Sequence, residues 1–108
     1  MSQAPLEPGI LSLAGLVDYQ EGSIVSRTLL GKPTGNVTLF AFDQGQGLSP
    51  HTSPFDALAL AVEGEAEVTI MEERYSLAPG EVLFLPANQP HAVLAPQRCK
   101  VLLMMIRS

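Results

Sequence analysis

The chain has 108 residues and a formal net charge of −5, with 46% hydrophobic and 16% charged residues. This length supports one domain with one core, and the composition is that of a globular chain rather than a disordered one. The six basic residues are scattered, which argues against nucleic acid or an anionic membrane surface as a partner, because both reward clustered Lys and Arg.

The N-terminal residues carry no positive charge and no apolar h-region, so no signal peptide is expected. The longest apolar stretches, 57–62 and 101–106, are too short to span a bilayer. The single cysteine, Cys99, excludes an internal disulfide and is interpreted as a buried, inert thiol. Together these features predict a cytoplasmic protein.

The predicted elements begin with a loose tail over residues 1–9 and a short helix near residues 10–18, where apolar residues recur at helical spacing and Ser12 is placed to cap. From Gly22 onward the apolar period falls to two. Turn signals then separate short segments, and we predict strands near 23–30, 37–42, 55–63, 65–71, 73–77, 81–85, 90–95 and 99–106. Short strands with frequent turns are typical of an all-β sandwich or barrel.

Two stretches hold the only two histidines of the chain. In the first, Gly45 is followed by five residues and then His51; in the second, Gly80 is followed by five residues, Pro86 and, later, His91. Over residues 36–106 these spacings resemble the paired motifs of the cupin superfamily. The resemblance implies a cupin-type double-stranded β-helix, a jelly-roll barrel. We therefore expect one cupin domain over residues 1–108, with the tail and short helix in residues 1–22.

The resemblance also implies a metal site of three histidines and a glutamate, from which this sequence departs. Ser53 stands at the second histidine position and Ala57 at the glutamate position, so only His51 and His91 remain. Two imidazoles make a poor site for a retained Zn²⁺, Fe²⁺, Mn²⁺ or Ni²⁺ ion. Asp56 would replace the glutamate only if a bulge shifted the register, because one residue in a strand reverses the side-chain direction.

The same alternation predicts a small-molecule pocket inside the barrel. Alanines at positions 57, 59 and 61 would line the interior, while Leu58, Leu60 and Val62 would face the other side. The predicted pocket comprises His51, Ser53, Ala57, Ala59, Ala61 and His91. The alternative is that bulky residues of other strands fill this space, namely Phe40, Phe42, Phe84, Met104 and Met105.

Three functions stay open on the sequence alone. The first is a cupin that binds a small, largely apolar molecule between His51 and His91. The second is a metal-dependent enzyme of dioxygenase or isomerase type, in which those histidines hold a divalent metal. The third is a structural or regulatory dimer whose barrel is only core. A homodimer is expected from the resemblance and because the strand at 57–62 is apolar on both faces, unless the N-terminal helix covers its outer side.

Overall fold

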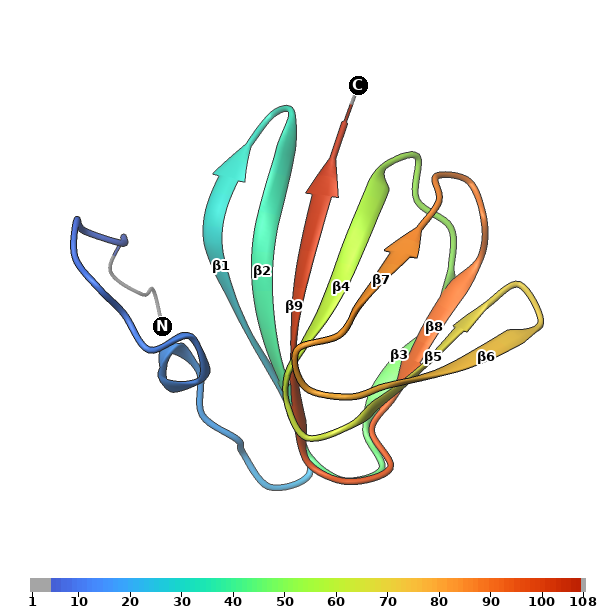
Figure 1. Cartoon of the computed structure of the whole chain (residues 1–108), viewed down its shortest axis with the longest axis horizontal. Helices are drawn as coiled ribbons and strands as arrows, with labels where there is room; N and C mark the ends of the chain where they lie inside the picture. The colour runs from blue at the N-terminus through green and yellow to red at the C-terminus, as the bar shows by residue number, and fades with distance from the viewer. Residues whose placement is uncertain (1–4, 108) are drawn as a thin grey trace.

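The computed structural model describes residues 5–107, which form nine strands in two antiparallel sheets (Figure 1). The five-stranded sheet has the order β1-β2-β9-β4-β7 and the four-stranded sheet the order β3-β8-β5-β6. The strands are β1 (Ile24–Lys32), β2 (Gly35–Phe42), β3 (Gly47–His51), β4 (Asp56–Glu63), β5 (Ala66–Ile70), β6 (Glu73–Leu77), β7 (Val82–Leu85), β8 (His91–Leu94) and β9 (Cys99–Ile106). The predicted all-β barrel is therefore confirmed.

Two parts of the chain differ from the sequence-based prediction. The helix expected over residues 10–18 is a single 3₁₀ turn, η1 (Leu13–Leu16), and Ser12 caps it through its backbone carbonyl rather than its side chain. Val17 is extended and buried, so packing against the sheet ends the helix. The strand β3 was not among the predicted segments, because Pro50 interrupts the apolar alternation there. The predicted tail, residues 1–9, lies partly outside the described residues.

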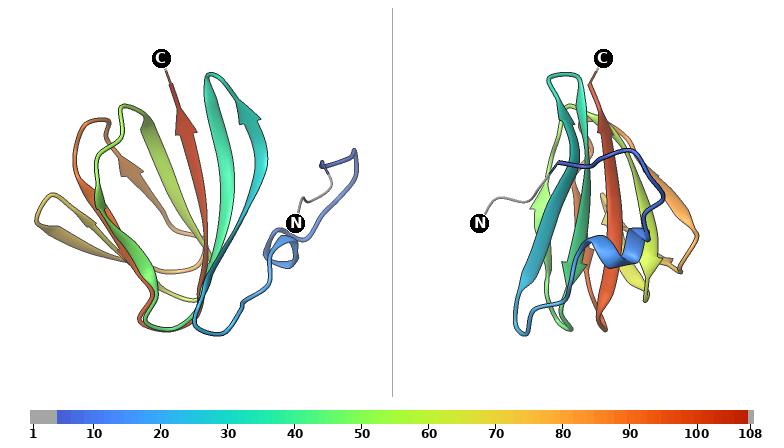
Figure 2. Two further views of the ribbon diagram at one scale, coloured as in Figure 1. Left: turned by 180° about the vertical axis from the view of Figure 1, so that it is seen from behind. Right: turned by 90° about the vertical axis from the view of Figure 1, so that its left-hand side faces the viewer.

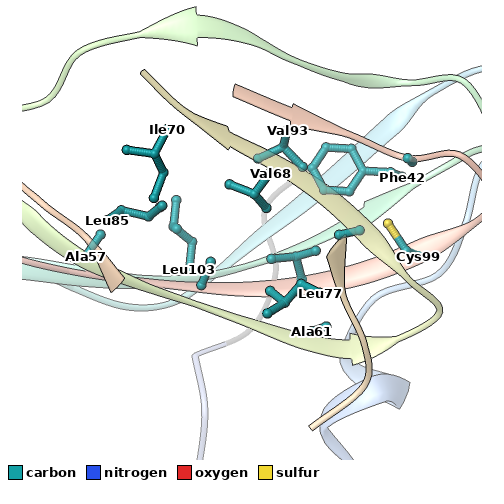
Figure 3. Close-up of a cluster of buried hydrophobic side chains, with 14 residues drawn as sticks. Phe42, Ala57, Ala61, Val68, Ile70, Leu77, Leu85, Val93, Cys99 and Leu103 are labelled. Carbon is teal, nitrogen blue, oxygen red and sulfur yellow. The ribbon is translucent and has the colours of Figure 1, made fainter. Parts of the chain in front are cut away.

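The main core lies between the two sheets. Along β4 the exposed fractions of Ala57, Ala59 and Ala61 are 5%, 1% and 1%, so the predicted inward parity is correct. Larger side chains such as Leu85 and Leu103 share this core with the three alanines (Figure 3). The core also contains Cys99, whose burial raises the pKa of its thiol to about 11, as expected for an inert cysteine.

A second, smaller core lies on the outer face of the five-stranded sheet. The N-terminal segment crosses this face (Figure 2), and Val17 is buried there with Leu39 and Leu102. Leu60 and Val62 pack against the same cluster. The N-terminal segment thus covers one end of the outer face of β4. This is the arrangement expected if the N-terminal segment, rather than a second subunit, covers the apolar outer side of this strand.

Polar contacts tie this segment to β9. The ammonium of Lys100 donates a hydrogen bond of 2.6 Å to the carbonyl of Ala14 and lies 4.9 Å from the centre of the Tyr19 ring. The Tyr19 hydroxyl donates a bond of 2.6 Å to Glu63. Burial and Glu63 together raise the pKa of Tyr19, so this phenol stays protonated and keeps its bond.

Gly45 of the first motif stretch and Gly64 of the turn between β4 and β5 give a matched test of backbone constraint. Gly64 (φ +68°) approaches the Arg98 carbonyl and Cys99 so closely that an added Cβ would clash, whereas Gly45 (φ +83°) has nothing within 4 Å. We expect Gly64→Ala to lower the free energy of unfolding by about 3 kcal/mol or more, and Gly45→Ala by about 1 kcal/mol from left-handed strain alone. Urea unfolding measures both, and equal losses would show that the close approach of Gly64 to the backbone is not a constraint.

Candidate functional site

The two histidines lie on neighbouring strands of the four-stranded sheet, as the paired motif spacing predicts. His51 ends β3 and His91 begins β8, and the two residues are direct partners in the ladder. Their ring centres are 4.4 Å apart with an angle of 69° between the ring planes. His91 is 6% exposed while His51 is exposed, so one ring is set into the barrel and the other lies at its rim.

A bulge in β3 makes this pairing possible. Leu48 lies opposite Val93 and His51 opposite His91, so three steps along β3 correspond to two steps along β8. In a regular ladder Pro50 would face His91. The extra residue on β3 therefore reverses the side-chain parity between Leu48 and His51 and brings the second imidazole beside the first. Pro50 lies within this irregular segment, where the missing N–H costs no ladder hydrogen bond.

Each ring is oriented by a backbone carbonyl two residues earlier. Nδ1 of His51 is 2.9 Å from the oxygen of Ser49, and Nδ1 of His91 is 3.4 Å from the oxygen of Gln89. A carbonyl oxygen only accepts, so both Nδ1 atoms carry the proton in these bonds. In the neutral ring the lone pair is then on Nε2.

The electrostatic environment favours neutral His91. Burial is the main reason that the pKa of His91 lies below its ordinary value of 6.5, and the neighbouring His51 ring lowers this pKa further. The Gln89 carbonyl opposes both effects only in part. The pKa of His91 therefore lies below that of an ordinary histidine, which favours the neutral imidazole.

The predicted rim residue Ser53 has a structural role in the loop between β3 and β4. Its hydroxyl oxygen accepts a hydrogen bond of 3.1 Å from the N–H of Phe55. Its carbonyl accepts a bond of 2.7 Å from the N–H of Asn88, in the loop between β7 and β8. The second bond joins the loop that leads out of β3 to the loop that leads into β8, beside the histidine pair.

Asp56 does not replace the missing glutamate. The register of β4 against β9 is regular from Asp56 to Ala61, so Asp56 shares its parity with outward-facing Leu58. Its carboxylate accepts a hydrogen bond of 2.9 Å from the N–H of Ala87 instead. The register shifts beside this segment lie elsewhere, between Leu48 and His51 on β3 and between Ala61 and Glu63 on β4.

The residues present do not fit a retained divalent metal ion. Within residues 5–107 no group of three or more His, Cys, Asp or Glu side chains is placed to hold an ion. Ala57, at the expected glutamate position, offers no donor atom, and Ser53 is already bonded within its loop. The pair of imidazoles alone falls short of the three or more protein ligands that such an ion normally takes.

Two of the bulky residues considered as fillers of the barrel face outward. Phe84 is 54% exposed, and Met104 packs with the outer cluster, whereas Phe40, Phe42 and Met105 contact the inner core. Phe84 and Met104 help to line an apolar depression of about 300 Å³ with Leu58 and Ile106. This depression was not among the sites predicted from the sequence, although the outward parity of Leu58 was a signal for it.

Comparisons with known proteins agree on the family. The family described as "Cupin domain" matches residues 38–106. A conserved protein of unknown function from Streptococcus pyogenes is 33% identical with a TM-score of 0.91, the match covering 95% of this chain and 90% of that one. A cupin superfamily protein from Desulfitobacterium hafniense is 29% identical with a TM-score of 0.90, covering 96% and 95%.

A cupin 2 conserved barrel domain protein from Leptotrichia buccalis is 39% identical with a TM-score of 0.87; the match covers 90% of this chain and 47% of that one. Among curated proteins, none matches this chain. Residues 5–107 include no helix with the length and apolar character needed to cross a membrane.

The lowered pKa of His91 predicts how stability depends on pH. Below the ordinary histidine value the unfolded chain binds more protons than the folded chain, so stability is full above pH 6.5 and decreases as the pH falls through this range. We expect urea unfolding to show lower stability at about pH 5 than at about pH 7.5, and a weaker dependence in His91→Gln. Arg98 lowers the pKa of Asp43 to about 2 from its ordinary value of 3.8, so the protonation of Asp43 affects stability at lower pH than that of His91. An unchanged dependence in His91→Gln would contradict the prediction.

Proposed function

We propose that this chain, which belongs to the cupin superfamily, is a small-molecule-binding protein whose ligand contacts His51 and His91. The observation that carries the proposal is the pair of imidazoles, with ring centres 4.4 Å apart and both Nδ1 atoms bonded to the backbone. This arrangement leaves two Nε2 atoms without a protein partner in the described residues. A cupin with two of the four metal ligands replaced but this pair retained is better suited to holding a molecule than to holding an ion.

The remaining predicted pocket residues have different roles at the proposed site. Ser53 supports the rim through its loop bonds. Ala57 is the least buried of the three alanines, and Ala59 and Ala61 are almost fully buried. We therefore propose that the ligand lies across the mouth of the barrel rather than deep within it.

The alternative function is a metal-dependent enzyme of dioxygenase or isomerase type. The feature in its favour is that a neutral Nε2 is also the atom by which histidine binds a metal. It would need further ligands from water or substrate, because the protein supplies two.

Elemental analysis separates the two functions. We expect protein purified without chelator to contain well below one metal ion per chain, because two imidazoles retain an ion weakly. The His51→Ala variant should contain the same trace amount. A stoichiometric ion that is lost in His51→Ala would instead favour the metal-dependent enzyme.

We also propose a cytoplasmic homodimer that uses the uncovered part of the outer sheet face. Beyond the N-terminal segment this face exposes Leu58 (40%), Val82 (54%), Phe84 (54%) and Ile106 (69%). A contiguous apolar surface of this kind commonly marks a partner site. A two-fold contact would bury the surface against its own copy.

Replacing one residue of this surface tests the dimer. Leu58→Glu places a charge at its centre, so we expect sedimentation equilibrium to show a dimer for the unmodified chain and a monomer for the variant. Leu94→Glu is the matched control, because Leu94 is 46% exposed on β8 of the other sheet. A monomeric unmodified chain, or equal loss of the dimer in both variants, would contradict this interface.

A further inference from the structure

Building on the ligand site proposed above, we infer that His51 and His91 act as a pair of hydrogen-bond acceptors for a neutral molecule that carries O–H or N–H donors on an apolar body. The inference rests on which nitrogen of each ring is already used. It concerns the class of ligand and needs no metal ion.

The backbone carbonyls beside the two rings determine the tautomer of each ring. Both Nδ1 atoms face backbone carbonyls, at 2.9 Å for His51 and 3.4 Å for His91, and a carbonyl has no proton to donate. A neutral imidazole has one N–H and one lone pair. Both Nε2 atoms therefore present lone pairs, and a partner at this site must supply the protons.

Access to these lone pairs follows from the burial of the two rings. Neither Nε2 has a hydrogen-bond partner among the described residues. Although His91 is only 6% exposed, no side-chain nitrogen or oxygen in residues 5–107 is both fully buried and unpaired. The Nε2 of His91 must therefore lie within its small exposed area. A ligand can reach this atom and that of exposed His51 from the same side of the ladder.

The charge of the site bears on the class of ligand. Burial and the neighbouring imidazole both disfavour a proton on His91, so this ring is a poor cationic partner for a carboxylate or phosphate. Charged side chains at the start of β4 and on β6 do not supply a cationic surface. Asp56 is bonded to Ala87, Glu73 lies opposite Ile70, and Arg74 is paired with Glu67 at 3.1 Å. The net charge of −5 also disfavours an anionic ligand.

The tautomers, access and charge of the histidine pair predict different affinities for three simple probes that share an aromatic ring. Catechol offers two adjacent O–H donors, its dimethyl ether offers none, and benzoate offers only acceptors and a negative charge. We expect catechol to bind, and the dimethyl ether and benzoate to bind about ten-fold more weakly or not at all, because an acceptor left unpaired on binding costs affinity.

The measurement is nitrogen-15 NMR of the histidine rings at about pH 8, where histidine side chains are neutral, with chelator present to remove metal. We expect both rings to show protonated Nδ1 and unprotonated Nε2, and catechol to shift the Nε2 signals. Catechol should not shift the remaining ring in His51→Ala, a variant at an exposed position that should leave the barrel folded. Leu30→Ala, at an exposed position on β1 of the other sheet, serves as the matched control.

Two results would contradict the acceptor pair alone, and one would contradict the ligand site as well. Protonated Nε2 on both rings, or stronger binding of benzoate or the dimethyl ether at the histidines, would overturn the acceptor pair while leaving a ligand site in place. If none of the three probes shifts either ring, the result counts against the acceptor pair and the proposed ligand site together. Catechol binding that depends on omitting the chelator would assign the site to a metal ion instead.

Discussion

The two-residue alternation of side chains along the strands is the constraint on which this structure depends. On β4 it places small alanines inside and Leu58, Leu60 and Val62 outside, and the inner positions then accommodate the larger side chains of the facing strands. Because one register fixes both faces, a slip of a single residue would bury the wrong set. Both the inner core and the outer apolar surface follow from this one register.

The candidate site depends on the bulge in β3, where the alternation of side chains is broken next to a histidine. The extra residue between Leu48 and His51 turns His51 toward His91. Bulges at sheet edges commonly re-aim a side chain in this way, and β3 is an edge strand. The two loops beside the pair are joined by the bond from Asn88 to Ser53, which limits how far the rings can separate.

The N-terminal segment links the fold to the surface that remains free. Lys100 is a largely buried charge on β9, but its bond to Ala14, the Tyr19 ring and Glu63 at 3.8 Å replace the water that it loses. By anchoring η1 over Leu102, these contacts cover one end of the outer sheet face and leave the other end, around Phe84, exposed. The same contacts therefore define where a partner could bind.

The sequence by itself determined the all-β barrel, most of its strands and the inward parity of the alanines on β4, because turn residues and a two-residue apolar period are local signals. The resemblance to cupin motifs also pointed to His51 and His91 as neighbours, and the structure pairs them in one ladder. Only the tertiary structure decided the bulge in β3, the outward positions of Phe84 and Met104, and the reduction of the predicted helix to the 3₁₀ turn Leu13–Leu16. These features arise from contacts between residues distant in sequence, and local propensity carries no information about such contacts.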